Sequence, residues 1–215
     1  MTEAERPQHH PDQVGAQVLG VAMAHTDWFH ALDRGVYLVA GRPSPRQLRV
    51  PVGDAQRLLR QTARVVADVP AKGSGDVVWT AGVSELLVRT GALELTCESG
   101  VVTVGVPVAC DQLRKGAVVG VPFAVGSEKA PAGLVMSTLA RPSGPAVVVA
   151  GWGEAITAFA WEALVHLAQS LCAATGADTA GDPLVPGAIG AARDVLLLQP
   201  MARHRAPEPV KRGHR

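Results

Sequence analysis

The sequence has few cysteines, almost no excess charge and no long apolar run. Its three cysteines are an odd and scattered set, which fits a reducing compartment better than a disulfide framework. A net charge of +1 is too small to draw the chain strongly to nucleic acid or to a membrane surface. No apolar run approaches the roughly 20 residues that span a bilayer. The first ten residues contain acids and no apolar stretch, unlike a signal peptide. We therefore expect a cytoplasmic protein with neither a membrane nor a nucleic acid as its partner.

The composition is that of a folding chain. Apolar residues make up 47% of the 215 residues and charged residues only 18%, which is enough to fill the core of one domain. We expect a disordered N-terminus over residues 1–10, one domain over 11–176 and an appendage over 177–200. Residues 201–215 are expected to be a disordered, basic and solvated tail.

Hydrophobic periodicity and turn residues predict alternating helices and strands. Helices are expected over 11–32, 54–69 and 154–174, and strands over 35–41, 47–52, 76–80, 93–97, 101–108, 118–125 and 134–139. Two stretches stay open: 76–80 is a strand or the lip of a pocket, and 86–88 is a strand or a single helical turn. Pro107 is expected to turn the end of its strand into an edge or a loop, and Pro186 to precede a short helix.

The helices expected over 54–69 and 154–174 each have apolar residues along one face. Asp54 is expected to cap the helix over 54–69. Its buried face is expected to hold Leu58, Leu59, Val65 and Val66, and its wet face Arg57, Arg60 and Arg64. The closing helix has apolar residues at spacings of three and four, and Gly176 is suited to end it. Strands 118–125 and 134–139, paired as a hairpin, would lie beneath that helix.

Two local patterns resemble a GAF domain, a small sensor fold. Leu87-Val-Arg-Thr-Gly-Ala-Leu-Glu-Leu resembles the family's Arg-Thr-Gly turn and the apolar strand after it. Val118-Val-Gly-Val-Pro-Phe, followed by Ala132-Gly-Leu-Val-Met, resembles its Val-Pro hairpin. The resemblance covers about residues 14–175. It implies an α+β fold, with an antiparallel sheet and the terminal helices packed on one face, and a homodimer formed through those helices. Ligand-binding domains of some bacterial transcription regulators have a related fold, but no helix-turn-helix segment is recognisable in this sequence.

The leading functional hypothesis is a non-catalytic sensor or regulatory module that binds a small, largely apolar molecule. The face of the sheet away from the helices would be covered by residues 70–92 and 100–117, and the ligand would lie beneath them. The residues expected to line this pocket are Trp79, Ser84, Thr90, Cys97, Cys110 and Phe123. The identity of the ligand, and of any cofactor, is not predicted.

Two other functions stay open. Ala109-Cys110-Asp111 resembles a stretch of the free methionine sulfoxide reductases, which are GAF-fold thiol enzymes. Cys97 would resolve Cys110 in such an enzyme if their strands abut, but Ser84 stands where that family carries a further cysteine. The third possibility is a structural or partner-binding protein whose apolar helix faces pair with another chain.

Two polar clusters are judged to be solvated rather than metal-binding. His25, Asp27, His30 and Asp33 are close in sequence but have no further ligand nearby. Glu162 and His166 lie one helical turn apart, without the second histidine of a zinc protease motif. No metal site is therefore predicted.

Overall fold

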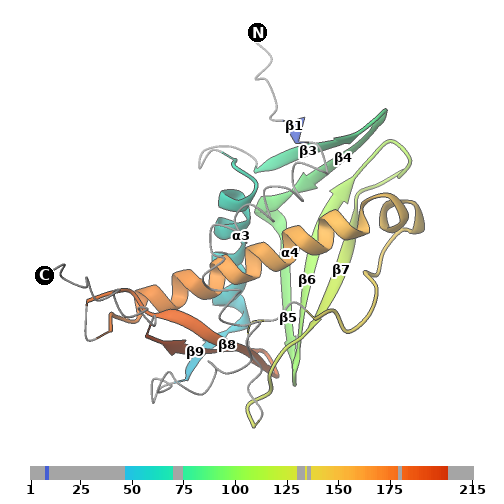
Figure 1. The fold of residues 1–215 in the computed structure, drawn as a ribbon. Helices are drawn as coiled ribbons and strands as arrows, with labels where there is room; N and C mark the ends of the chain where they lie inside the picture. Colours follow the sequence, from blue (N-terminus) through green and yellow to red (C-terminus); the bar gives the residue numbers. More distant parts are fainter. Residues whose placement is uncertain are drawn as a thin grey trace, which may run out of the picture.

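The computed structural model describes residues 8–9, 47–69, 75–129, 134, 137–178 and 181–202. It shows a mixed α+β fold with two sheets and two helices in these residues (Figure 1). The elements are β1 (Gln8–His9), β2 (Leu48–Pro51), α3 (Val52–Val66), β3 (Asp76–Ala81), β4 (Ser84–Arg89), the 3₁₀ turn η1 (Thr90–Ala92), β5 (Glu94–Glu98), β6 (Val101–Ala109), β7 (Ala117–Ala124), α4 (Ala146–Ala174), β8 (Val185–Ala192) and β9 (Val195–Met201). The predicted helix over 11–32, the predicted strand over 35–41 and the tail from 203 lie outside the described residues.

The larger sheet is organised around β6. Strand β7 pairs antiparallel with β6 along one side, while β5 and the end of β4 share the other side. Strand β3 forms a hairpin with β4, and β1 adds a short parallel pairing to β3. The predicted alternation of β5 is confirmed, because Leu93, Leu95 and Cys97 are buried and Glu94 and Thr96 are exposed.

Pro107 lies inside β6, so the prediction of an edge or a loop there is wrong. Strand β5 pairs with residues 101–105 of β6, whereas β4 pairs only with residues 108 and 109. Pro107 therefore falls in the gap between these two partners. Proline has no backbone N–H, but on the side of β6 that β4 and β5 share no strand lies opposite Pro107. No hydrogen bond between strands is lost there, which is why this central strand tolerates the proline.

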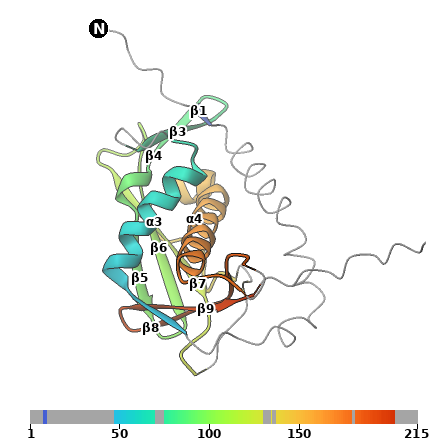
Figure 2. The same ribbon diagram turned by 90° about the vertical axis from the view of Figure 1, so that its left-hand side faces the viewer.

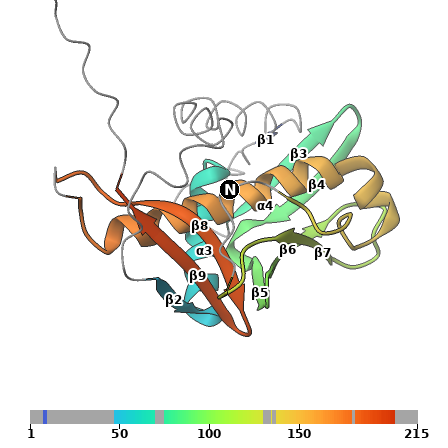
Figure 3. The same ribbon diagram turned by 60° about the horizontal axis from the view of Figure 1, so that its bottom comes forward.

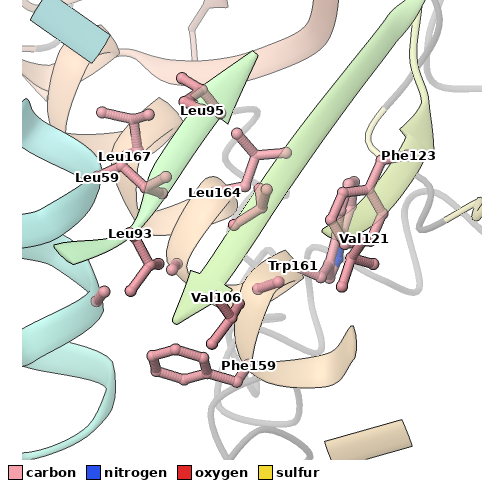
Figure 4. Packing of buried hydrophobic residues seen from close by; sticks show 14 of the residues in the cluster. Leu59, Leu93, Leu95, Val106, Val121, Phe123, Phe159, Trp161, Leu164 and Leu167 are labelled. Carbon is pink, nitrogen blue, oxygen red and sulfur yellow. The ribbon is translucent and has the colours of Figure 1, made fainter. Parts of the chain in front are cut away.

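Helices α3 and α4 pack together on one face of the larger sheet, as Figure 2 shows. Their contact includes a hydrogen bond of 3.1 Å from the Thr62 hydroxyl to the Ala163 carbonyl. Figure 4 shows Leu59 of α3, Leu164 of α4 and Val106 of β6 converging between helices and sheet. Burial of each such side chain contributes about 1.5–3 kcal/mol, so this layer is the core of the fold.

The buried stripe of α3 differs from the predicted one. The helix begins at Val52, after Pro51, and Asp54 lies in its first turn beside Arg57 rather than capping it. Val65 is 69% exposed. It follows Leu59 by six residues, about 240° around the helix, so it points away from the core when Leu59 points into it. The buried residues of α3 are Ala55, Leu59, Thr62 and Ala63.

The polar side chains of Gln56 and Arg60 attach α3 to the edge strand β5. Arg60 Nε donates to the Leu93 carbonyl at 2.9 Å, and the Leu95 N–H donates to Gln56 Oε1 at 3.0 Å. The predicted wet face therefore holds for Arg57 but not for Arg60, which is partly buried. These bonds satisfy backbone groups that an uncovered edge strand would leave open.

Helix α4 starts at Ala146, well before the predicted start at Glu154, and ends at Ala174 as predicted. It is long and apolar enough to cross a membrane by length and composition alone. This is weak evidence, because a core helix meets the same criterion, and 56% of its most apolar stretch is buried within the protein.

Residues 185–201 form a hairpin rather than the short helix predicted after Pro186. Strands β8 and β9 pair with each other, and β2 completes a second sheet in the order β2-β9-β8 (Figure 3). Gly190 of β8 forms a parallel bridge with Gly126, just after β7. Ile189, Leu196 and Leu198 belong to the common core. The predicted appendage is thus packed against the rest of the fold.

Candidate functional site

A groove of about 1,060 Å³ lies between the first half of α4 and the segment 137–144 that precedes it. We call it the α4 groove. Its lining residues are Thr138, Arg141, Pro142, Ser143, Gly144, Ala146, Val149, Ala150, Gly151, Gly153, Glu154, Thr157 and Ala158.

The segment 137–144 is held at the outer edge of β7. The Leu139 N–H donates to the Pro122 carbonyl at 2.9 Å, and Ser143 and Gly120 exchange two backbone bonds of 2.8 Å. Of the predicted strand 134–139, residues 135 and 136 lie outside the described residues, and the described residues 137–139 pair with β7 through an isolated bridge rather than a regular strand. The irregular path leads the chain off the sheet edge and up to α4, so that the segment and the helix form two walls.

The helix wall of the groove is made largely of small residues. Gly151 is exposed, and a Cβ atom placed on it would meet nothing within 4 Å. Glycine inside a helix costs about 0.5–1 kcal/mol relative to alanine, so helix formation itself opposes this residue. Packing within the described part of the protein supplies no reason for it. The lack of a side chain instead leaves the helix backbone open to close approach from the groove.

The groove carries one charge of each sign. Arg141 comes from the segment wall and Glu154 from α4, and both are exposed. Neither forms an ion pair or a side-chain hydrogen bond with any residue that the structure describes. No described residue therefore competes for either charge.

Comparison with known proteins identifies no family. No protein-family model matches this chain, and neither the curated proteins nor the solved structures contain a match.

The predicted pocket residues do not lie in the α4 groove. Trp79 and Phe123 are buried on the helix-covered face of the sheet, with ring centroids 5.6 Å from Phe159 and 5.3 Å from Trp161 respectively. They serve as core residues there.

The other four predicted residues are spread across the sheet. Thr90 is fully buried, and its hydroxyl donates to the Gly75 carbonyl. Cys97 is buried in β5, Cys110 is half-buried after β6, and Ser84 is exposed at the start of β4. The register places Cys97 and Phe123 on either side of Val102 of β6, whereas exposed Ser84 lies at the far end of the β3–β4 hairpin, so the six residues do not form one lining.

The segments expected to cover the sheet are themselves part of it, which corrects the predicted position of residues 70–92 and 100–117. Most of the described residues in these ranges form β3, β4 and β6, and most of the others form η1 and the short connection 110–116. Both faces of strand β6 carry mostly apolar residues. Val102, Val104, Val106 and Val108 face the core, and the alternate residues Val101, Thr103, Gly105, Pro107 and Ala109 lie on the other face. The run over 101–108, in which both sets of alternating residues are apolar, is therefore a central strand of the sheet and not a loop that covers it.

Cys97 cannot resolve Cys110 in this fold. Although β5 and β6 do abut, Cys97 pairs with Val102 near the start of β6, and Cys110 follows its end. Eight residues of strand separate these points, which corresponds to about 26 Å at about 3.3 Å per residue. The thiol-reductase alternative therefore lacks its resolving partner.

Alkylation should distinguish the three thiols. Burial, with a smaller contribution from the Asp194 carboxylate, raises the pKa of Cys97 to about 11, and burial raises the pKa of Cys172 to about 12. Iodoacetamide at pH 8 should label half-buried Cys110 in the native protein faster than Cys97 and Cys172, because their burial and raised pKa values keep these two as unreactive thiols. Labelling of Cys97 should rise about tenfold per pH unit below its pKa. Mass spectrometry of tryptic peptides measures this, and equal labelling of all three native thiols would contradict it.

The Glu162–His166 pair is not the solvated pair that the sequence predicts. Glu162 is only 7% exposed, and its Oε1 lies 3.0 Å from His166 Nε2. The pair lies where α4 is buried on most of its sides. The two side chains are one helical turn apart, so each supplies the polar partner that the other needs when buried. Among the residues described by the structure, no three potential metal ligands come together. The predicted cluster from His25 to Asp33 lies outside those residues.

Proposed function

We propose that this chain is a non-catalytic, ligand-binding module with a regulatory role, and that its ligand lies in the α4 groove. One observation carries the proposal: Arg141 and Glu154, which pair with no described residue, meet in one groove with the glycine at position 151. The lining residues include no histidine, cysteine or lysine, and Glu154 is their one carboxylate. Such a lining suits recognition better than acid–base or nucleophilic chemistry.

A relationship to GAF-like sensors belongs to the same proposal. It is supported by the antiparallel sheet with α3 and α4 packed on one face, and by the order of a β-strand, a pairing segment and a long helix. The three free cysteines support a cytoplasmic setting. We further propose a homodimer, whose dissociation on dilution can be followed by light scattering.

Filling the groove should abolish binding. The wild-type chain is screened by thermal shift against a library of cellular metabolites, and by phage display against random peptides, and the hits are retested on variants. Gly151→Trp should weaken binding of a genuine ligand at least about tenfold, because the indole would occupy the groove. Gly53→Trp is the matched control, since Gly53 is also an exposed helical glycine with nothing within 4 Å of a Cβ atom. It should bind as wild type does.

The charge-reversal variant Arg141→Glu provides a second test if Gly151→Trp does not fold, since Arg141 is exposed and forms no ion pair with the described residues. Hits that bind wild type, Gly151→Trp and Arg141→Glu equally well would overturn the proposal. So would the absence of any hit in both libraries.

A further inference from the structure

We infer that two copies of this chain pair face to face through the outer face of the larger sheet. The inference rests on the proposed function only for the homodimer, to which it assigns a surface, and it does not involve the α4 groove. We define the outer face as the face of β6 and β7 that points away from α3 and α4 (Figure 2). Its residues are Val101, Thr103, Gly105, Pro107 and Ala109 of β6 and Val118, Gly120, Pro122 and Ala124 of β7.

The outer face is apolar although it is not packed against the core. An antiparallel sheet with one face in water normally carries polar residues on that face, as β5 does with residues 94, 96 and 98. On the outer face Thr103 is the one polar side chain. Val118 is 42% exposed, and neither it nor Val101 belongs to the core cluster or to the apolar residues packed against that cluster. A contiguous apolar surface of this kind marks an interaction site.

The flat shape and the size of this surface favour a second sheet as its occupant. Sheets pack with apolar faces together about 10 Å apart, whereas a small ligand needs a concave site. Strand β6 has nine residues, and at about 3.4 Å per residue it is about 30 Å long. The sheet is four strands wide from β7 to β3, about 19 Å at a spacing of about 4.8 Å. Two such faces bury about 1,100 Å² in total, just above the roughly 1,000 Å² that a specific interface needs.

Two charges flank the outer face at neighbouring levels of β6. Glu94 of β5 is the register partner of Gly105 and leans over it, since a Cβ atom placed on that glycine would lie 3.3 Å from Glu94 Oε2. Arg89 ends β4 and, by the register of that strand, lies level with Pro107. Both side chains are exposed, and neither pairs with a described residue. A carboxylate that is buried with an apolar face needs a cation beside it.

A two-fold axis between the copies supplies that cation. The axis runs across the strands at Val106, so it exchanges the levels of Gly105 and Pro107. Glu94 of each copy then faces Arg89 of the other, and both charge pairs form at once. This is an isologous interface, in which the same patch of both copies is used and is complementary to itself.

The sizes of the side chains support the same axis. Gly105 and Gly120 are register partners at one level of the sheet, and Pro107 and Val118 are partners at the next. The axis across the strands sets the bulkier level of each copy against the glycine level of the other. An axis along the strands, between β6 and β7, would set glycine against glycine and Pro107 against Val118, which packs poorly.

The other acids beside the outer face lie far from this axis. Glu98 is the register partner of Val101, and Glu85 lies past the level of Ala109, so the axis brings Glu98 and Glu85 to the same end. Strands of packed sheets cross at about 30°, which separates residues at the ends of the strands. The charge pairing therefore depends on Glu94 and Arg89.

A charge-reversal series on the full chain tests the inference. The dissociation constant of the dimer is measured by sedimentation velocity over a dilution series. Arg89→Glu and Glu94→Arg should each raise it at least about tenfold, because each change places like charges together twice in the interface. The double variant should return it to within about threefold of the wild-type value, because the pairs are re-formed with their signs exchanged.

Val118→Lys should also raise the dissociation constant at least about tenfold, because it places a charge at the centre of the apolar contact. Val65→Lys is the matched control, since Val65 is 69% exposed on α3, and it should leave the dimer unchanged. Thermal denaturation of the monomeric form should give the same midpoint for both lysine variants. A lower midpoint for Val118→Lys alone would show that the chain covers its own outer face, and would overturn the inference.

The outcomes separate this inference from the proposed function. A dimer broken by Val65→Lys but not by Val118→Lys would overturn the inference and place the contact on the helices. Single reversals that weaken the dimer without recovery in the double variant would overturn the proposed axis and with it the inference. A chain that is monomeric at every concentration would overturn both the inference and the homodimer. None of these results affects ligand binding in the α4 groove, which Gly151→Trp tests separately.

Discussion

Replacing Trp79 by alanine is expected to lower the free energy of unfolding by about 3–5 kcal/mol, the range for removing a large buried aromatic side chain. Trp79 is 1% exposed on β3. Its ring lies 5.6 Å from that of Phe159 in an edge-on contact and 6.4 Å from that of Trp152. Both partners belong to α4, so Trp79 is the main aromatic contact between the β3–β4 hairpin and this helix. Chemical denaturation at 25 °C measures the loss.

Val83→Ala is the matched control for this prediction. Val83 lies in the turn between β3 and β4 and is fully exposed, so its replacement should change the free energy of unfolding by less than about 0.5 kcal/mol. If Trp79→Ala also cost less than about 1 kcal/mol, Trp79 would not be packed in a core. It would instead line an open space, as the pocket predicted from the sequence requires.

Gly190→Ala is expected to destabilise the protein by about 1–3 kcal/mol, the typical cost of forcing atoms into a packed site. A Cβ atom at this position would lie 2.9 Å from the Gly126 carbonyl oxygen and 3.4 Å from Leu197 Cβ. The first neighbour is backbone and cannot rotate away. Gly126 also donates to the Ile189 carbonyl and accepts from the Ala191 N–H, at 3.0 and 2.8 Å.

This change tests whether the second sheet is joined to the first at this point. Gly53→Ala is the control, because a Cβ atom there meets nothing within 4 Å. Alanine should stabilise α3 by about 0.5–1 kcal/mol. Thermal or chemical denaturation of the two variants should thus shift in opposite directions. A Gly190→Ala protein as stable as wild type would show that β8 is not held against Gly126.

The sequence predicted the elements whose pattern arises within one segment. Strand β5 alternates between apolar and polar residues, and the second half of α4 repeats apolar residues every three or four positions. Both patterns depend only on local backbone geometry and burial of one face. The coarse α+β architecture with antiparallel sheets follows from such elements, and the structure confirms it.

The failed predictions depend on partners that are distant in sequence. Pro107 is tolerated because β4 and β5 leave a gap beside β6, which local sequence cannot reveal. Pro186 was expected to precede a short helix, but pairing with β9 makes residues 185–192 a strand. The side of α3 that carries Val65 is exposed because α4 and the sheet lie on the other side.

The α4 groove was missed because it has no chemical motif. It arises where an irregular segment leaves the edge of β7 and meets a helix, and neither wall alone forms a cavity. The available signal was Gly151 and Gly153 directly before the apolar stripe of the closing helix. The predicted helix began at Glu154, whereas both glycines lie within α4. A helical glycine without a packing role points to close approach by something else.

The most direct test of the central claim is the position of the bound ligand, measured by backbone amide shifts in heteronuclear NMR. The full chain is titrated with a selected peptide, or with a metabolite if no peptide is selected. We expect the largest shifts within residues 137–158, the two walls of the α4 groove. Largest shifts around Ser84, Thr90 and Cys110, with residues 137–158 unmoved, would contradict the account and restore the pocket predicted on the sheet.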